Sequence, residues 1–192
     1  MGDSRFVDKS ILAPIFIALG CAVSLTLGQP LGAIFFAFGL LSVCVFKANL
    51  FTGKVGYWWR PKFLLALCFV LIINLVIGYG MGVLISITNN SLTAVALSKV
   101  LSWDFSGVFF VKSVFCGMIM YICVEMFRKG EKFGIFLGVP LFIYCDFQHC
   151  IANIIYLGIA NTWSWTIILA IVGNAIGSMF INLLDMGWQY NE

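Results

Sequence analysis

His149 is the only histidine of the chain, and it lies inside an apolar run from about 133 to 157. An imidazole there can donate an N–H bond and exchange a proton. Asp146 and Gln148 interrupt the same run, and Asn49–Gly53 forms a second polar interruption after an earlier apolar run. Polar groups in apolar surroundings are costly unless they are paired or line a wet cavity, so these residues are candidates for function. The alternative is a histidine that bonds a backbone carbonyl and only ties helices together.

The elements that position these residues must lie in a membrane. Of the 192 residues, 62% are hydrophobic and only 10% are charged, whereas soluble domains contain about 25% charged residues. Such a chain has too little polar surface for water, so the lipid bilayer must be its solvent. This composition excludes a disordered protein, a nucleic-acid-binding protein and a cytosolic enzyme. The length suits one transmembrane domain over residues 1–192.

Apolar runs at about 11–28, 31–47, 63–87, 107–127, 133–157 and 164–185 predict six transmembrane helices. No alternation typical of a β-barrel is present. The runs divide into two halves, about 10–87 and 107–187, that resemble each other weakly. Three spans in each half make the repeat inverted in the membrane. The second and fifth runs are each interrupted by polar residues at matching positions, which points to a site at the membrane midplane. Asn74 and Asn174 each lie near spaced glycines, which we expect to allow close helix packing.

The positive charges orient this bundle. If the spans alternate, eight basic residues lie on one side and only two, Lys99 and Lys112, on the other. Cytoplasmic loops carry the excess of lysine and arginine, so both termini are predicted to be cytoplasmic in the inner (cytoplasmic) membrane. The eight are Arg5, Lys9, Lys54, Arg60, Lys62, Arg128, Lys129 and Lys132. The tryptophans near span ends are expected at the membrane interfaces: Trp58, Trp59, Trp103, Trp163, Trp165 and Trp188.

Broken helices can create an anion site without a fixed charge. The second half of such a helix begins with unpaired N–H groups and the positive end of a dipole. Two half-helices that start at the membrane midplane would point both positive ends at the same place. His149 could add a donor there and, by protonating a carboxylate, lower its desolvation cost.

Two stretches resemble the signatures of the formate/nitrite transporter family. Asn49-Leu50-Phe51-Thr52-Gly53 and Phe147-Gln148-His149-Cys150-Ile151-Ala152-Asn153 are similar to patterns that read approximately LFTGN and GFEHSxAN. Val172–Gly177 resembles the glycine motif of the last helix, and the order of the motifs agrees. The resemblance covers the chain from about Lys9 to Trp188.

The resemblance implies an all-α, aquaporin-like protomer in a homopentamer, with its own pore for a small monovalent anion or weak acid. It places His149, Thr52 and Asn153 at the pore centre. An outer constriction corresponds to Phe36, Leu40 and Phe142, and an inner one to Phe51 and Met120.

Two charged residues depart from the family pattern. Lys47 occupies the place of a small residue, and Asp146 replaces the glycine before Phe147. Gln148 also replaces the usual glutamate, and Gly117 a common asparagine. One hypothesis is that Lys47 and Asp146 form an ion pair near the pore centre, because either charge alone would be expensive there. The other is that Lys47 reaches to an interface and Asp146 caps the second half-helix.

The predicted function is passive or proton-coupled passage of a small anion such as formate, nitrite or hydrosulfide. The alternatives are a pore for a different or neutral solute and a non-conducting membrane sensor or scaffold. No enzyme activity, cofactor or metal site is expected. The cysteines lie in apolar runs without metal-ligand spacing and are expected to behave as small buried hydrophobic residues: Cys21, Cys44, Cys68, Cys116, Cys123, Cys145 and Cys150.

Overall fold

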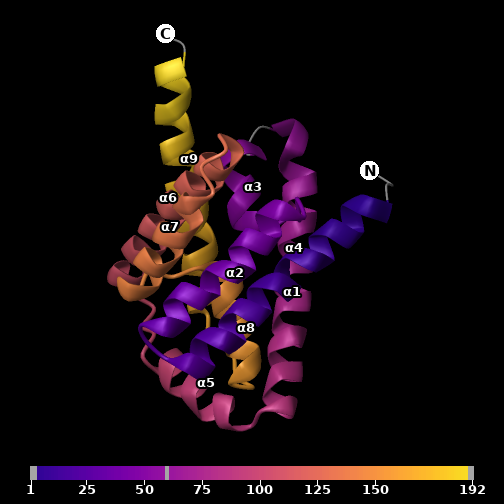
Figure 1. The fold of residues 1–192 in the computed structure, drawn as a ribbon, viewed down its shortest axis with the longest axis vertical. Coiled ribbons are helices and arrows are strands. Elements are labelled where there is room, and N and C mark those ends of the chain that lie inside the picture. Colours follow the sequence, from indigo (N-terminus) through magenta and orange to yellow (C-terminus); the bar gives the residue numbers. More distant parts are fainter. Residues whose placement is uncertain (1–3, 59–60, 190–192) are drawn as a thin grey trace.

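The computed structural model describes residues 4–58 and 61–189. Over these residues the chain forms helices joined by turns and loops, without a strand (Figure 1). The helices are α1 (Ser4–Leu27), α2 (Leu31–Val45), α3 (Phe51–Trp58), α4 (Pro61–Thr88), α5 (Ser91–Leu101), α6 (Gly107–Arg128), α7 (Phe133–Tyr144), α8 (Cys150–Ile159) and α9 (Thr166–Gln189). The predicted all-α class is confirmed.

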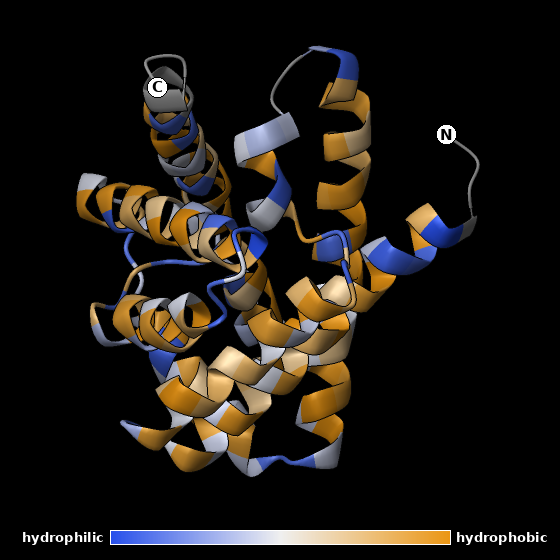
Figure 2. Cartoon of the chain, turned by 45° about the horizontal axis from the view of Figure 1, so that its top comes forward, coloured by the Kyte–Doolittle hydropathy of each residue, from blue (hydrophilic) through white to orange (hydrophobic). Residues whose placement is uncertain are grey.

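Four helices are long and apolar enough to cross a membrane. These spans are Arg5–Leu27, Pro61–Thr88, Gly107–Arg128 and Thr166–Asp185. Large apolar side chains cover their outward surfaces, and Leu65 and Ile87 of α4 are 78% and 74% exposed. In Figure 2 hydrophobic residues predominate along the helices, and hydrophilic residues lie mainly near the helix ends and in the loops. The chain is therefore a multi-pass membrane protein.

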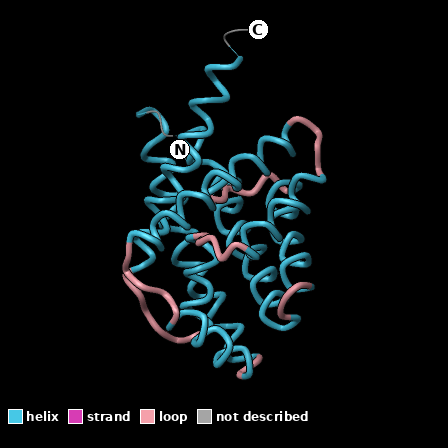
Figure 3. Tube along the Cα trace, turned by 90° about the vertical axis from the view of Figure 1, so that its left-hand side faces the viewer, coloured by secondary structure: helices cyan, strands magenta, loops and turns pink. Residues whose placement is uncertain are grey.

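The other two crossings are each made of two short helices. The pair α2 and α3 has 15 and 8 residues, and the pair α7 and α8 has 12 and 10. At 1.5 Å per residue, the longest of them reaches only about 22 Å, less than the hydrocarbon core of about 30 Å. Loops therefore lie within the bundle as well as at its ends (Figure 3). The predicted breaks in the second and fifth helices are confirmed.

Both breaks have the same backbone geometry. Lys47 follows α2 with a φ of 53°, and Asp146 follows α7 with a φ of 52°. The amide of the next residue bonds the carbonyl five positions earlier, at 2.9 Å in the first break and 2.8 Å in the second. This is the Schellman ending of a helix, whose left-handed position is usually glycine. The geometry explains why a small residue or glycine suits these two positions.

One helix was not predicted. α5 lies within the stretch 88–104, which the polar punctuation indicated as a separator between spans. Leu92, Ala96 and Val100 are buried at intervals of four residues, so one face of α5 packs on the bundle, chiefly on α8. Its 11 residues are too few to cross the membrane, and α5 covers one end of the bundle (Figure 1).

Glycines bring two pairs of helices, α4 with α8 and α6 with α9, into close contact. A Cβ on Gly82 of α4 would collide with the backbone of Ile155 in α8, and a Cβ on Gly177 of α9 would collide with the backbone of Val114 in α6. Only hydrogen fits at such distances. The predicted packing role of the glycines is confirmed.

The cysteines and tryptophans follow the predictions in part. All seven cysteines are free thiols, but Cys68 and Cys145 are exposed and therefore not buried hydrophobic residues. Trp163 and Trp165 are exposed between α8 and α9, as interfacial residues would be, whereas Trp103 is 9% exposed and belongs to the core. Trp59 and Arg60 lie outside the described residues, as does the side chain of Trp188.

Candidate functional site

His149 caps the second half-helix of the broken α7–α8 crossing. Its Nδ1 accepts a hydrogen bond of 3.0 Å from the backbone N–H of Ala152, in the first turn of α8. An acceptor nitrogen carries no hydrogen, so a neutral ring in this position has its proton on Nε2. The ring is 2% exposed. The cap therefore sets both the direction of the ring and its tautomer.

The Nε2 atom of His149 faces Thr52, in the first turn of α3. The distance from Nε2 to Oγ1 is 2.9 Å, and Thr52 is 1% exposed. With the proton on Nε2, histidine donates and the threonine oxygen accepts. The hydroxyl hydrogen of Thr52 then remains available to a third group. Residues 97 positions apart thus join the first turns of both half-helices.

A buried asparagine holds the start of α3. Asn74 of α4 accepts a 2.9 Å bond through Oδ1 from the N–H of Phe51. Its Nδ2 donates to the carbonyls of Ser10, at 2.8 Å, and of Asn49, at 3.2 Å. The first N–H of α3, expected to be unpaired, is therefore satisfied by this side chain.

The second half of the chain repeats these bonds. Asn174 of α9 accepts a 2.8 Å bond from the N–H of Cys150 at the start of α8. It donates to the carbonyls of Ser113, at 2.7 Å, and of Gln148, at 2.8 Å. Equivalent atoms are used in both halves, as two inverted repeats require.

The predicted outer constriction forms one aromatic cluster with the histidine. The ring of Phe142 stacks on His149 with centroids 5.9 Å apart, and it meets Phe36 edge to face at 5.8 Å. Leu40 is 1% exposed, one turn after Phe36 on α2. Phe51 and Met120, predicted for the inner constriction, are 4% and 1% exposed and belong to the same apolar core.

Asn153 lies in the first turn of α8 but bonds a different neighbour. Its Nδ2 donates to Oε1 of Gln148 at 3.1 Å, and its backbone N–H bonds the carbonyl of His149 at 2.8 Å. Gln148 in turn donates from Nε2 to the carbonyl of Asp146 at 2.8 Å. Asn153 thus stabilises the break next to His149.

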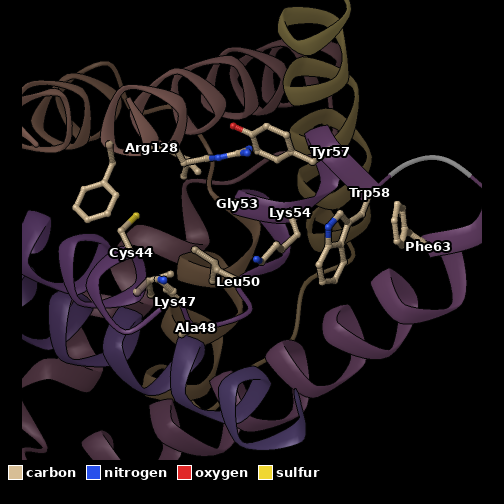
Figure 4. A pocket seen from close by; sticks show the side chains of 13 residues that line it. Cys44, Lys47, Ala48, Leu50, Gly53, Lys54, Tyr57, Trp58, Phe63 and Arg128 are labelled. Atoms are coloured by element: carbon tan, nitrogen blue, oxygen red, sulfur yellow. The ribbon is translucent and has the colours of Figure 1, made fainter. Parts of the chain in front are cut away.

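A cavity of about 710 Å³ opens beside the first break. Its basic lining residues are Lys47 in the break, Lys54 on α3 and Arg128 at the end of α6 (Figure 4). The Lys54 ammonium lies 4.9 Å from the ring centre of Trp58, and the Arg128 guanidinium lies 4.5 Å from that of Tyr57. We call this space the large cavity.

A much smaller cavity of about 20 Å³, room for about one water molecule, lies beside the second break. Asp146, His149, Asn153, Lys99 and Tyr156 are among its lining residues. We call this space the small cavity. His149 and Phe142 therefore stand at its wall.

The predicted ion pair between Lys47 and Asp146 is wrong. Asp146 binds Lys112 of α6 at 2.7 Å and Lys99 of α5 at 3.8 Å, while Lys47 lines the large cavity. The two residues occupy equivalent positions in an inverted repeat, which places them on opposite sides of the midplane. Asp146 does not cap α8 either, because His149 holds that position.

Four partners of the site were missed from the sequence. Asn74 and Asn174 were noted only as neighbours of glycines, although polar residues at matching depth in both halves were the signal for their shared role. In the sequence, Lys99 and Lys112 indicate only the orientation of the bundle. Nothing in their spacing indicates a contact with Asp146.

Comparison with known proteins identifies the fold. No protein-family model matches the sequence, and no curated protein does. Among solved structures, a pentameric formate channel with formate bound superposes with a TM-score of 0.80, at 18% identity over 98% of this chain and 97% of the channel. An ion channel of the FNT family superposes with a TM-score of 0.76, at 17% identity over 98% of this chain and 90% of that protein. The chain, with its six crossings and two broken helices, therefore has the fold of these channels.

Proposed function

We propose that the chain belongs to the formate/nitrite transporter family and forms a pore for small monovalent anions such as formate, nitrite or hydrosulfide. The single observation behind this proposal is the 2.9 Å contact between Thr52 and His149. It lies where two half-helices begin, so two positive dipole ends converge on a buried place without a net charge. The likeness of the whole chain to a formate channel supports the same conclusion.

The hydrogen-bond pattern suggests how an anion would be held. Nε2 of His149 donates to Thr52, which leaves the hydroxyl hydrogen of Thr52 for the anion. On either side the anion would meet apolar constrictions, the outer at Phe36, Leu40 and Phe142, the inner at Phe51 and Met120. Desolvation there limits passage to small ions.

Passive passage fits the histidine better than passage coupled to ring protonation. A second proton would have to enter at Nδ1, which already accepts the N–H of Ala152. Protonation would therefore break the cap of α8. A pH-sensitive dye inside vesicles separates the two modes, because only a coupled anion acidifies the interior.

The assembly and orientation follow from the same proposal. Each protomer would be one pore of a homopentamer, as in the formate channel, and native mass spectrometry would show five copies.

We place the end of the bundle that bears the large cavity in the cytoplasm, in a cytoplasmic (inner) membrane. Seven of the described basic residues lie at this end: Arg5, Lys9, Lys54, Lys62, Arg128, Lys129 and Lys132. The proposed repeats remain about 10–87 and 107–187.

Anion flux into proteoliposomes tests the function. Thr52→Val removes the hydroxyl and keeps the shape, so formate, nitrite or hydrosulfide entry should fall about tenfold, the effect of losing one hydrogen bond. Thr52→Ser is the matched control and should keep the flux, whereas His149→Phe should abolish it.

The other outcomes identify the alternatives. Flux of a neutral solute such as urea, unchanged in Thr52→Val, would favour a neutral-solute pore. No flux of any small solute through correctly assembled protein would favour a scaffold.

A further inference from the structure

The two helix breaks place opposite charges on opposite sides of the site. Lys47 and Asp146 each occupy the left-handed position of a break, with φ of 53° and 52°. Each lies four residues before the first residue of its half-helix, Phe51 or Cys150. The two breaks therefore have the same backbone conformation and are related by the inverted repeat. The first break carries a cation at this position, and the second carries a carboxylate.

Lys47 adds to an excess of positive charge in the large cavity. Lys54 and Arg128 line the same space (Figure 4). Arg128 lies 3.6 Å from Glu125, which offsets its charge in part. In the described part of the chain, neither Lys47 nor Lys54 has a carboxylate within ion-pair distance. This cavity therefore favours anions.

Asp146 has the contrary effect at the small cavity. Its carboxylate binds Lys112 at 2.7 Å and Lys99 at 3.8 Å, and Lys99 lines the small cavity together with Asp146. Lys99 also lies over the ring of Tyr156, 5.5 Å from its centre. The carboxylate reduces the pull of both lysines on an approaching anion.

The charges beside the large cavity and those beside the small cavity act separately. Arg128 lines the large cavity, and Lys112 binds Asp146 beside the small one. These two residues of α6 are 16 positions, or about 24 Å, apart along the helix. The Debye length is about 10 Å at 0.1 M salt, so an anion at one cavity is screened from the charges beside the other cavity. A unit charge about 6 Å from an ion in water changes its local concentration about threefold.

We infer that Lys47 and Asp146 make the pore asymmetric, so that anions enter more readily from the large cavity than from the small one. This inference rests on the proposed function. Under a driving force, anion flow from the large cavity exceeds the reverse flow, while the equilibrium distribution is unaffected. With the large cavity facing the cytoplasm, the pore favours release of small organic anions over their uptake.

Current–voltage curves in planar bilayers test this inference on the assembled protein. In symmetric 0.1 M sodium formate, the wild-type currents at opposite voltages should differ about threefold or more, and the difference should nearly vanish at 1 M. The double variant Lys47→Gln/Asp146→Asn keeps the side-chain sizes and should bring the ratio close to one. The exchange Lys47→Asp/Asp146→Lys should reverse the preferred direction, with orientation read from a thiol label on one end.

Lys132→Gln is the matched control. It removes one positive charge from the same end of the molecule but outside the large cavity, so it should leave the ratio as in the wild type. If Lys47→Gln/Asp146→Asn fails to assemble, the double variant Lys47→Gly/Asp146→Gly takes its place. Glycine adopts the left-handed backbone of both positions without steric cost.

The outcomes separate the two proposals. Formate currents that are equal in both directions in the wild type, or a ratio unchanged in the neutral double variant, would overturn the asymmetry and leave the channel function standing. Absence of any anion current in the wild type would overturn both. An effect of Lys132→Gln as large as that of the double variant would assign the asymmetry to general surface charge and overturn the role of the breaks.

Discussion

At the scale of single residues, the site depends on side chains that satisfy the backbone of two interrupted helices. Nδ1 of His149 accepts the N–H bond that caps α8, and Nε2 of the same ring donates to the hydroxyl of Thr52. Asn74 and Asn174 each satisfy three backbone groups, one N–H and two carbonyls. In a bilayer no water replaces a lost partner, so irregular backbone persists there only where protein groups take its hydrogen bonds.

Asn174 should therefore be essential for folding. Asn174→Leu would leave the N–H of Cys150 and the carbonyls of Ser113 and Gln148 without this partner. The Ser113 carbonyl lies inside α6 and keeps its helical bond, so two groups are left unsatisfied. At about 1–3 kcal/mol for each, we expect a loss of at least about 2 kcal/mol and little assembled protein. Thermal stability in detergent, followed by size-exclusion chromatography, measures this loss.

Asn182 on the same helix is the control. Its Nδ2 donates to one partner, the hydroxyl of Tyr121, at 2.9 Å. Asn182→Leu should lower the melting temperature much less. Equal effects of the two variants would contradict the special role of Asn174.

At the scale of elements, close packing of the long helices positions the half-helices. α9 packs along α6 and holds the break before α8 through Asn174. α3 is tied to α6 by a 2.6 Å hydrogen bond from the Tyr57 hydroxyl to Glu125. The half-helices of 8 and 10 residues would not be stable alone, so their direction depends on these longer neighbours.

Gly117 tests this dependence. A Cβ at Gly117 would collide with the backbone of Asn174, so Gly117→Ala should push α9 from α6 and disturb the break. We expect about 1–3 kcal/mol of destabilisation, as for overpacking in a core, and reduced anion flux. Thermal stability and proteoliposome flux measure the two effects.

Gly107→Ala is the matched substitution in the same helix. No atom lies within 4 Å of a Cβ at this position. Stability and flux should remain as in the wild type. Comparable damage from both substitutions would show that close contact between α6 and α9 is not the cause.

At the scale of the whole molecule, charge is distributed unequally between the two ends. Lys129 and Lys132 lie at the junction of α6 and α7, on the end with the large cavity. The opposite end has Lys99 and Lys112, both bound to Asp146. Because basic residues tend to be retained in the cytoplasm, this distribution supports the proposed orientation.

Cysteine labelling in intact cells tests the orientation. In a background where Cys44, Cys68 and Cys145 are serine, Ser102→Cys should react with a membrane-impermeant thiol reagent added outside. Lys132→Cys should react only after the membrane is opened. The reverse pattern would contradict the proposed orientation and, with it, the direction of the favoured anion flow.

Much of the fold follows from local composition. The six crossings, the two breaks and the place of His149 inside a crossing could be predicted, because hydropathy and polar interruptions are properties of short stretches of chain. α5 could not, because its pattern of buried residues becomes visible only against α8. Thr52 was named from a family resemblance and not from its own spacing.

The sequence by itself determined that the bilayer is the solvent, where the chain crosses it and which polar residues lie at depth. Only the tertiary structure decided which of these residues meet. Thr52 and His149 do, although 97 positions separate them, and Lys47 and Asp146 do not. The reason is geometric, because an inverted repeat places equivalent positions on opposite sides of the midplane. The two opposite charges therefore face the large and the small cavity instead of each other.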